Sequence, residues 1–176
     1  MIKNTQENPP GKGFGKAMWI ATWVVAMGLL TLYFGEREKS WLNPNQNPQS
    51  QVRLDGSREV LLQRNRSGHY VASGKINGKT AEFLLDTGAT DVAVSAELAQ
   101  HFGLIRGRKG IAATANGNVT VFQTRIDILE IGDIQLENVR ASINPSMGNF
   151  ILLGMSALKQ VEFIQRGDTL TLRQLN

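Results

Sequence analysis

The longest hydrophobic run in the chain lies near its start, at residues 17–34, and holds 18 residues without a charge. As an α-helix it would be about 27 Å long, close to the roughly 30 Å hydrocarbon core of a bilayer. A buried core helix rarely lacks any polar face, and bulky Tyr33 and Phe34 stand where a cleavage site needs small residues. The run therefore favours an uncleaved transmembrane anchor over a core helix or a cleaved signal peptide.

Charges on either side of this run predict its orientation. Lys3, Lys12 and Lys16 precede the run, against the acidic Glu7, whereas residues 36–39 sum to zero charge. Under the positive-inside rule, residues 1–16 form a cytoplasmic segment and everything after the anchor lies outside the cytoplasm.

Residues 35–58 contain a polar stretch, 43–50, with no apolar periodicity. Such a stretch buries too little apolar surface to offset the entropy lost on ordering. The pattern predicts a flexible linker of 24 residues with a relaxed reach of about 27 Å.

From residue 59 to residue 176 the pattern changes to short apolar segments separated by turn residues. Segments 70–76 and 80–85 flank Asn77-Gly78, a pair typical of two-residue β-hairpins. Two short helices are predicted, at 96–102 with Ser95 as the N-cap, and at 155–161. A further strand is predicted at 120–129, a pair of strands around Gly132-Asp133 within 131–143, and a segment at 163–172 that folds back across residues 166–168. Many short strands and two short helices predict a mostly β domain of closed or sandwich-like form.

Composition narrows the chemistry available to this domain. The 176 residues include no cysteine and only two histidines, His69 and His101, so thiol catalysis is excluded and a metal centre is disfavoured. We predict no metal and no cofactor. The net charge of the whole chain is +4, but residues 52–176 hold 14 basic and 12 acidic side chains and are therefore near neutral. This balance argues against nucleic acid as a partner.

The sharpest candidate for chemistry is Asp86-Thr87-Gly88, which follows the apolar residues 83–85. A carboxylate at the end of a buried strand is partly desolvated. Gly88 allows a tight turn that brings a backbone N–H toward the carboxylate, and Thr87 adds a hydroxyl that can bond to nearby backbone. An ordinary strand ending in an acidic turn is the simpler alternative.

Two weaker features follow along the chain. Asn116-Gly117 marks a hairpin tip of small and polar residues that could close over a cleft, although an ordinary exposed hairpin has the same pattern. Residues 151–153 form an apolar run that stops at Gly154, before the second predicted helix.

In this order the features resemble those of the retropepsin-like aspartic proteases, over residues 68–165. With the anchor, the chain resembles the bacterial single-pass members of that family, which face the periplasm from the inner membrane. The resemblance implies a mostly β, retropepsin-like closed domain over 59–176, with Asp86 as the catalytic aspartate and Thr87 and Gly88 completing its loop. The substrate-contacting residues that it implies are Ala89, Thr90, Asp91, Asn116 and Gly117.

One departure from the family concerns the support of the catalytic loop. Retroviral members often follow the glycine with Arg-Asn or Arg-Asp, whereas Met155-Ser156 follow Gly154 here. The ion pair that supports the loop in those enzymes is therefore expected to be missing.

The chain holds one Asp-Thr-Gly and no second copy of that motif. Aspartic-protease chemistry needs two carboxylates that share one proton, so the second must come from another chain. We therefore expect a homodimer with Asp86 at its two-fold axis. The expected function is a membrane-anchored endopeptidase acting on periplasmic or envelope polypeptides. The alternative is a catalytically silent peptide-binding or dimerisation module on the outer side of the cytoplasmic membrane.

Overall fold

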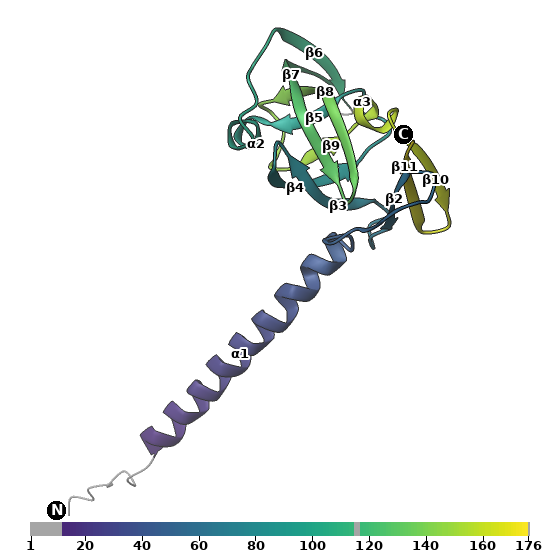
Figure 1. Cartoon of the computed structure of the whole chain (residues 1–176). Coiled ribbons are helices and arrows are strands. Elements are labelled where there is room, and N and C mark those ends of the chain that lie inside the picture. The colour runs from purple at the N-terminus through teal and green to yellow at the C-terminus, as the bar shows by residue number, and fades with distance from the viewer. Residues whose placement is uncertain (1–11, 115–116, 176) are drawn as a thin grey trace, which may run out of the picture. The chain divides into compact units, whose positions relative to one another are not determined.

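The structure is a computed structural model that describes residues 12–114 and 117–175. The chain divides into two compact units after Lys39. The first unit contains most of helix α1, Lys12–Leu42, and the second contains the described strands together with two shorter helices (Figure 1).

Helix α1 is apolar and exposed over the predicted anchor. By length and hydropathy it could cross a membrane, and none of its apolar window is buried; a signal sequence fits the same criteria. The hydroxyls of Thr22 and Thr31 donate to the carbonyls of Met18 and Met27 at 2.9 and 2.8 Å. Hydroxyls that are satisfied within the helix suit a segment surrounded by lipid. The helix also continues beyond residue 34, the predicted end of the anchor.

The second unit is built around a seven-stranded sheet that closes on itself. Its strands are β3 (Val71–Ile76), β4 (Lys79–Leu85), β5 (Val92–Ser95), β6 (Lys109–Thr114), β7 (Gly117–Ile131), β8 (Ile134–Asn144) and β9 (Ile151–Leu153). The order is β3-β4-β9-β5-β8-β7-β6, and β3 also pairs with β7. This extra pairing turns the sheet into a barrel whose interior holds the core, including fully buried Phe83, Ile126 and Ile143. The predicted mostly β, closed domain is confirmed.

Short-range signals predicted several elements of this barrel correctly. Asn77 and Gly78 have positive φ values of 49° and 77°, and they join β3 to β4 in the predicted two-residue hairpin. Helix α2, Ala96–His101, starts where the Ser95 side chain accepts a hydrogen bond from the Leu98 N–H at 3.2 Å. Helix α3, Met155–Leu158, begins as predicted but ends three residues earlier.

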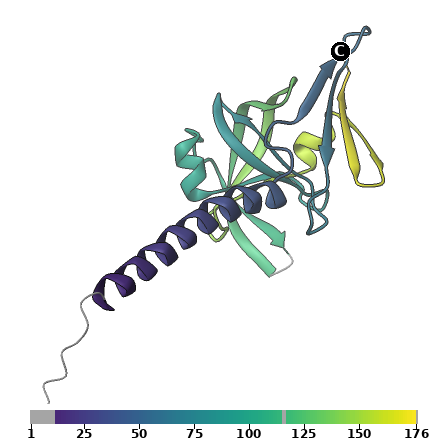
Figure 2. The ribbon, with the colours of Figure 1, turned by 90° about the horizontal axis from the view of Figure 1, so that it is seen from below.

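A second, four-stranded sheet lies to one side of the barrel (Figures 1 and 2). Its strands are β1 (Gln49–Val52), β2 (Arg58–Gln63), β10 (Glu162–Arg166) and β11 (Thr169–Gln174). The order is β1-β2-β11-β10, with every pairing antiparallel. The sheet thus joins the segment just after α1 to the C-terminal hairpin.

The structure differs from the flexible linker predicted at 35–58. Asn43 and Asn45 are only 2% and 3% exposed, and β1 pairs with β2. The Asn43 amide donates to Ser73 Oγ at 3.0 Å and to Glu82 Oε2 at 2.8 Å, and the Asn45 amide donates to two backbone carbonyls of the domain. This segment is ordered by hydrogen bonds from amide side chains, which a search for apolar periodicity does not detect.

The four-stranded sheet contains a buried carboxylate, Glu59, whose side chain is 3% exposed. Arg53 Nε lies 2.6 Å from one of its oxygens, and Arg173 Nη2 lies 2.5 Å from the other. Burial raises the pKa of Glu59, but hydrogen bonds from Arg53, Arg173 and Gln51 outweigh burial and hold the pKa below its ordinary value. Glu59 is therefore a charged link between β1, β2 and β11.

Candidate active site

Asp86 lies directly after β4, which pairs antiparallel with β3 on one side and parallel with β9 on the other. β4 pairs in parallel with β9, and Leu85 is opposite Leu153. The Asp86 N–H donates to the Leu153 carbonyl at 3.2 Å, which continues the ladder by one residue. The paired strands β4 and β9 therefore carry Asp86 to the end of the barrel, where its side chain is half-buried.

Residues 86–89 form a tight turn that holds the carboxylate of Asp86. The Gly88 N–H donates to Asp86 Oδ1 at 2.9 Å, and the Ala89 N–H donates to the Asp86 carbonyl at 3.2 Å. A Cβ at position 88 would lie 3.1 Å from Oδ1, so a larger residue would crowd the carboxylate. The Gly88 N–H therefore orients one oxygen of the Asp86 carboxylate. Thr87 and Gly88 are themselves exposed.

Gly154 braces this loop from below by its small size. A Cβ at this position would lie 2.3 Å from the carbonyl oxygen of Asp91 and 2.7 Å from that of Ala89. The next two N–H groups along the chain, those of Met155 and Ser156, donate to the carbonyls of Ala89 and Thr90 at 2.8 and 2.9 Å. The apolar run predicted to end at Gly154 therefore lies directly against the Asp86 loop.

Two side chains support the far end of the loop in place of the retroviral arginine. Arg140 on β8 forms an ion pair with Asp91, with 2.6 Å between Nε and Oδ1. The buried Ser156 hydroxyl accepts a hydrogen bond from the Val92 N–H at 3.0 Å and donates to the Arg140 carbonyl at 2.6 Å. The Arg140–Asp91 ion pair and the Ser156 hydroxyl therefore hold the end of the loop that begins at Asp86.

The residues that form this arrangement match a known protein family. A family model described as "gag-polyprotein putative aspartyl protease" matches residues 72–160, just over half of the chain. The match includes the Asp86 loop, Gly154 and the strands that carry them. The chain belongs to the retropepsin-like aspartyl protease family. We call its second unit, residues 40–176, the retropepsin domain.

Individual proteins are also similar to this chain, and one of them is described as a retropepsin-like aspartic protease. An uncharacterised protein in the cobV 5′ region of a Sinorhizobium species is 32% identical over an alignment of 178 residues, gaps included. The alignment covers 91% of this chain and 75% of that protein. An uncharacterised protein of Rickettsia prowazekii (strain Madrid E) is 28% identical over 105 residues, covering 58% of this chain and 45% of that protein. The crystal structure of a retropepsin-like aspartic protease from Rickettsia conorii matches with a TM-score of 0.57 and 25% identity, covering 73% of this chain and 94% of that one.

The β6–β7 hairpin of the retropepsin domain projects from the barrel (Figure 2). Thr114 pairs with Gly117 at its end, and the Thr114 hydroxyl donates to the Gly117 carbonyl at 2.8 Å. Gly117 has a φ of 102°, which suits glycine. Asn116, the other predicted tip residue, lies outside the described residues. Ile111 on β6 is 76% exposed, so little buried apolar surface holds this hairpin.

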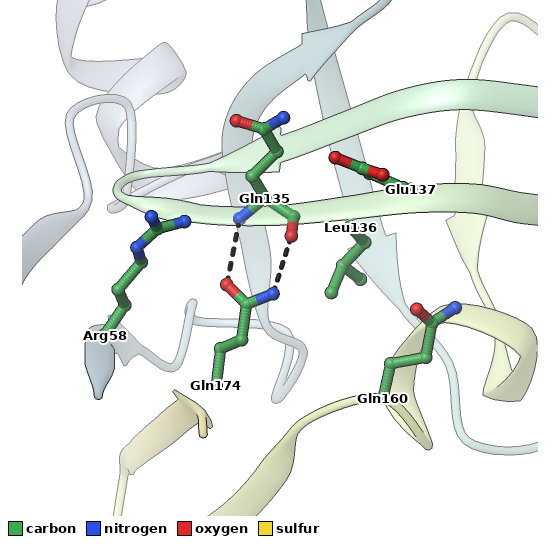
Figure 3. Close-up of a pocket in the computed structure, with 6 residues that line it drawn as sticks. All are labelled: Arg58, Gln135, Leu136, Glu137, Gln160 and Gln174. Carbon is green, nitrogen blue, oxygen red and sulfur yellow. Dashed lines mark hydrogen bonds between the residues drawn. The ribbon is translucent and has the colours of Figure 1, made fainter. Parts of the chain in front are cut away.

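Two surface hollows of about 370 Å³ each lie elsewhere on the retropepsin domain, since neither is lined by residues 86–91. In the first, the side-chain amide of Gln174 bonds to both backbone groups of Gln135, at 3.2 and 2.6 Å (Figure 3). The amide thus acts as a strand segment that joins β11 to β8. The residues lining this hollow are Arg58, Gln135, Leu136, Glu137, Gln160 and Gln174.

The Asp86 loop therefore presents one carboxylate that the Gly88 N–H orients. The six predicted residues from Asp86 to Asp91 lie on one loop, whereas Gly117 of the predicted tip is the first residue of β7. Within 12–114 and 117–175, no group of three or more histidine, aspartate or glutamate side chains is arranged to hold a metal ion. Sequence reasoning missed Arg140 and Ser156, which contact this loop from distant parts of the chain.

Proposed function

We propose that this chain is a membrane-anchored aspartic endopeptidase that works as a homodimer. The observation that carries the proposal is the Asp86 loop, in which the Gly88 N–H orients a half-buried carboxylate at the end of the paired strands β4 and β9. A silent binding module has no need for an oriented carboxylate at this point. Retropepsin-like proteases act as dimers on peptide substrates, and one such carboxylate per chain is half of the pair that the reaction needs.

The proposed reaction uses the two Asp86 side chains as a dyad with one shared proton. The ionised carboxylate accepts a proton from a water molecule as the water oxygen bonds to the scissile carbonyl carbon. The protonated carboxyl donates its proton to the carbonyl oxygen, which gives a tetrahedral gem-diol. This intermediate collapses as the C–N bond breaks: the carboxyl that gained the water proton donates it to the nitrogen, and the other carboxylate takes a proton from a gem-diol hydroxyl. The products are an amine and a carboxyl group, and the dyad again holds one proton.

Other groups in the proposed site position the substrate. Thr87 and Gly88 complete the loop, and the substrate backbone would lie along Ala89, Thr90 and Asp91. Asn116 and Gly117, the residues that the sequence predicts as a flap tip, would close over the bound chain. An extended peptide can bind by pairing as an additional strand with an exposed edge of a sheet.

The proposed location is the inner membrane, with the retropepsin domain in the periplasm. Helix α1 supports the anchor through its length, its hydropathy and its internally bonded threonine hydroxyls. The lysines before the apolar run support a cytoplasmic N-terminus. The proposed substrates are therefore polypeptides of the periplasm or envelope.

Substitution of Asp86 tests the enzymatic proposal. Full-length Asp86→Asn, which is nearly isosteric, should cleave peptide-library substrates at least about a hundredfold more slowly than the unmodified chain. The matched control is Asp127→Asn, the same change at an exposed position of β7, which should leave cleavage unchanged. Equal cleavage by the unmodified chain and Asp86→Asn would rule out the catalytic role, and no cleavage by a folded unmodified chain would favour the binding module.

A further inference from the structure

The connection between the apolar run of α1 and the retropepsin domain is much shorter than the predicted linker. The run ends at residue 34, and Trp41 and Leu42 already contact the loop at 64–69 within the retropepsin domain. The Asn65 amide donates to the Leu42 carbonyl at 2.9 Å, and the Arg66 guanidinium lies 4.0 Å from the centre of the Trp41 ring. Only residues 35–40 remain between the run and these contacts.

The length of this connection limits how far the contacts can be from the membrane. Six residues span about 9 Å as a helix and about 20 Å when fully extended. A headgroup layer is roughly 5–8 Å thick on each side of the hydrocarbon core. Because chain length sets this limit, it applies to any arrangement of the two units. Trp41 and the residues that touch it therefore remain close to the lipid headgroups whenever the run spans the bilayer.

The residues at this position have the chemistry of a lipid-facing surface. We define the juxtamembrane patch as Trp41, Leu42 and the loop 64–69. Trp41 and Leu42 are 40% and 56% exposed, and the loop sequence Arg-Asn-Arg-Ser-Gly-His contains no acidic residue. Tryptophan and arginine are the side chains that membrane surfaces attract, through the interfacial aromatic effect and through anionic headgroups.

The two arginines of the patch have different environments. Arg64 is held by the Gly68 carbonyl at 2.8 Å, and its Nη1 lies 3.7 Å from the carboxylate of Asp168. Arg66 is exposed and lies against the Trp41 ring, so an aromatic face and a cation are presented together. Arg66 is therefore the side chain of the patch that an anionic headgroup would meet with least competition.

We propose that the juxtamembrane patch binds anionic lipid headgroups and so fixes the height and tilt of the retropepsin domain over the membrane. This inference rests on the anchor in the proposed function. A domain held in this way meets its partner copy in a common plane and presents its active-site loop at a constant distance from the bilayer. Substrates would then be selected by the height of the cleavable segment above the membrane as well as by their sequence.

A single-cysteine label tests this contact, because the chain has no cysteine of its own. The full-length chain carries a fluorophore at Ser67→Cys in the patch, or at Ile105→Cys as the control. Residue 105 is 84% exposed and belongs to the loop between α2 and β6, which lies away from β2 in Figure 1. Each labelled chain is placed in vesicles of phosphatidylcholine with or without phosphatidylglycerol, and a nitroxide-headgroup lipid serves as the quencher.

We expect stronger quenching at position 67 than at position 105, and an increase at position 67 when phosphatidylglycerol is present. Arg66→Ala should remove most of that increase, since one arginine near an anionic surface is worth a factor of about five in local population. Arg106→Ala is the matched control, because its guanidinium also covers an aromatic ring, at 5.3 Å from the centre of Phe122. Arg106→Ala should leave the quenching at position 67 unchanged.

The outcomes separate this inference from the proposal beneath it. Equal quenching at both positions, or quenching that ignores phosphatidylglycerol, overturns the juxtamembrane patch, and peptide cleavage by the same vesicles then reports whether the anchored protease stands. Release of the chain from vesicles by alkaline carbonate overturns the anchor, and the patch fails with it.

Discussion

At the scale of single residues, the candidate site depends on one contact that sequence predicts and another that it does not. Gly154 is predicted because an apolar run stops at it, and the close carbonyl of Asp91 explains why a glycine is needed there. Arg140 gives no such signal. It lies 49 residues from Asp91, and the two meet only because β5 and β8 pair in parallel. The structural role of a glycine at the end of an apolar run can be predicted from the local pattern. A long-range ion pair cannot, because it depends on which strands pair.

A methyl group at position 154 should disturb the Asp86 loop. The added Cβ of Gly154→Ala would lie 2.3 Å from a backbone oxygen, and backbone cannot move aside without shifting the loop. We expect the free energy of unfolding to fall by about 1–3 kcal/mol and the cleavage rate to fall with it. Urea unfolding of the full-length chain in detergent and a peptide-cleavage assay measure the two effects.

Gly110→Ala is the stability control for that change. Its Cβ would meet only a Val121 methyl group at 4.0 Å, which is an ordinary contact. Its unfolding free energy should stay within about 0.5 kcal/mol of the unmodified chain. Equal unfolding curves for the two variants would show that the loop adapts to a methyl group and that Gly154 does not brace it.

At the scale of elements, local signals predicted hairpins and caps, while pairing between distant segments escaped prediction. Asn77-Gly78 and the Ser95 cap act over a few residues, so their patterns are sufficient. The segment 43–52 has a linker's composition, yet two buried asparagines and the pairing of β1 with β2 order it. Their hydrogen-bond partners lie on β2, β3 and β4, which no local pattern could indicate.

The four-stranded sheet should lose stability in acid because of Glu59. Its pKa is below the ordinary value in the folded chain, so the unfolded chain binds this proton more readily. The stabilisation is therefore complete above the ordinary glutamate pKa of about 4.3 and is lost as pH falls through the lower, folded value. Glu59→Gln should lower the urea midpoint at pH 7, and the difference from the unmodified chain should shrink as the solution is acidified.

Glu137→Gln is the control for this pH effect, because Glu137 is an exposed glutamate on β8. Its urea midpoints should follow those of the unmodified chain at every pH. A Glu59→Gln curve that stays parallel to the unmodified curve down to acid pH would contradict the role of the charged link. The loss would then come from altered packing, which does not depend on pH.

At the scale of the whole molecule, the pattern of the chain predicts the closed barrel, whereas the assembly is inferred from the single Asp-Thr-Gly. Alternating short strands and turn residues sufficed for a closed β domain, and the family match agrees with it. The proposed homodimer rests on the proposed reaction, because one carboxylate per chain supplies only half of the pair that shares a proton. The proposed anchor would favour pairing, because confinement to one membrane raises the effective concentration of chains.

Mixed dimers test the assembly most directly. If each site takes one Asp86 from each chain, a dimer of an unmodified chain and an Asp86→Asn chain holds a single ionisable catalytic group and should be inactive. Vesicles with a fixed amount of unmodified chain and a tenfold excess of Asp86→Asn should therefore cleave about tenfold more slowly, since random pairing leaves few unmodified pairs. The same excess of Asp127→Asn should raise the total rate, which controls for crowding in the vesicle. Cross-linking between differently tagged chains confirms that mixed dimers form. Undiminished cleavage in the presence of those mixed dimers would mean that the second carboxylate lies within the same chain as Asp86.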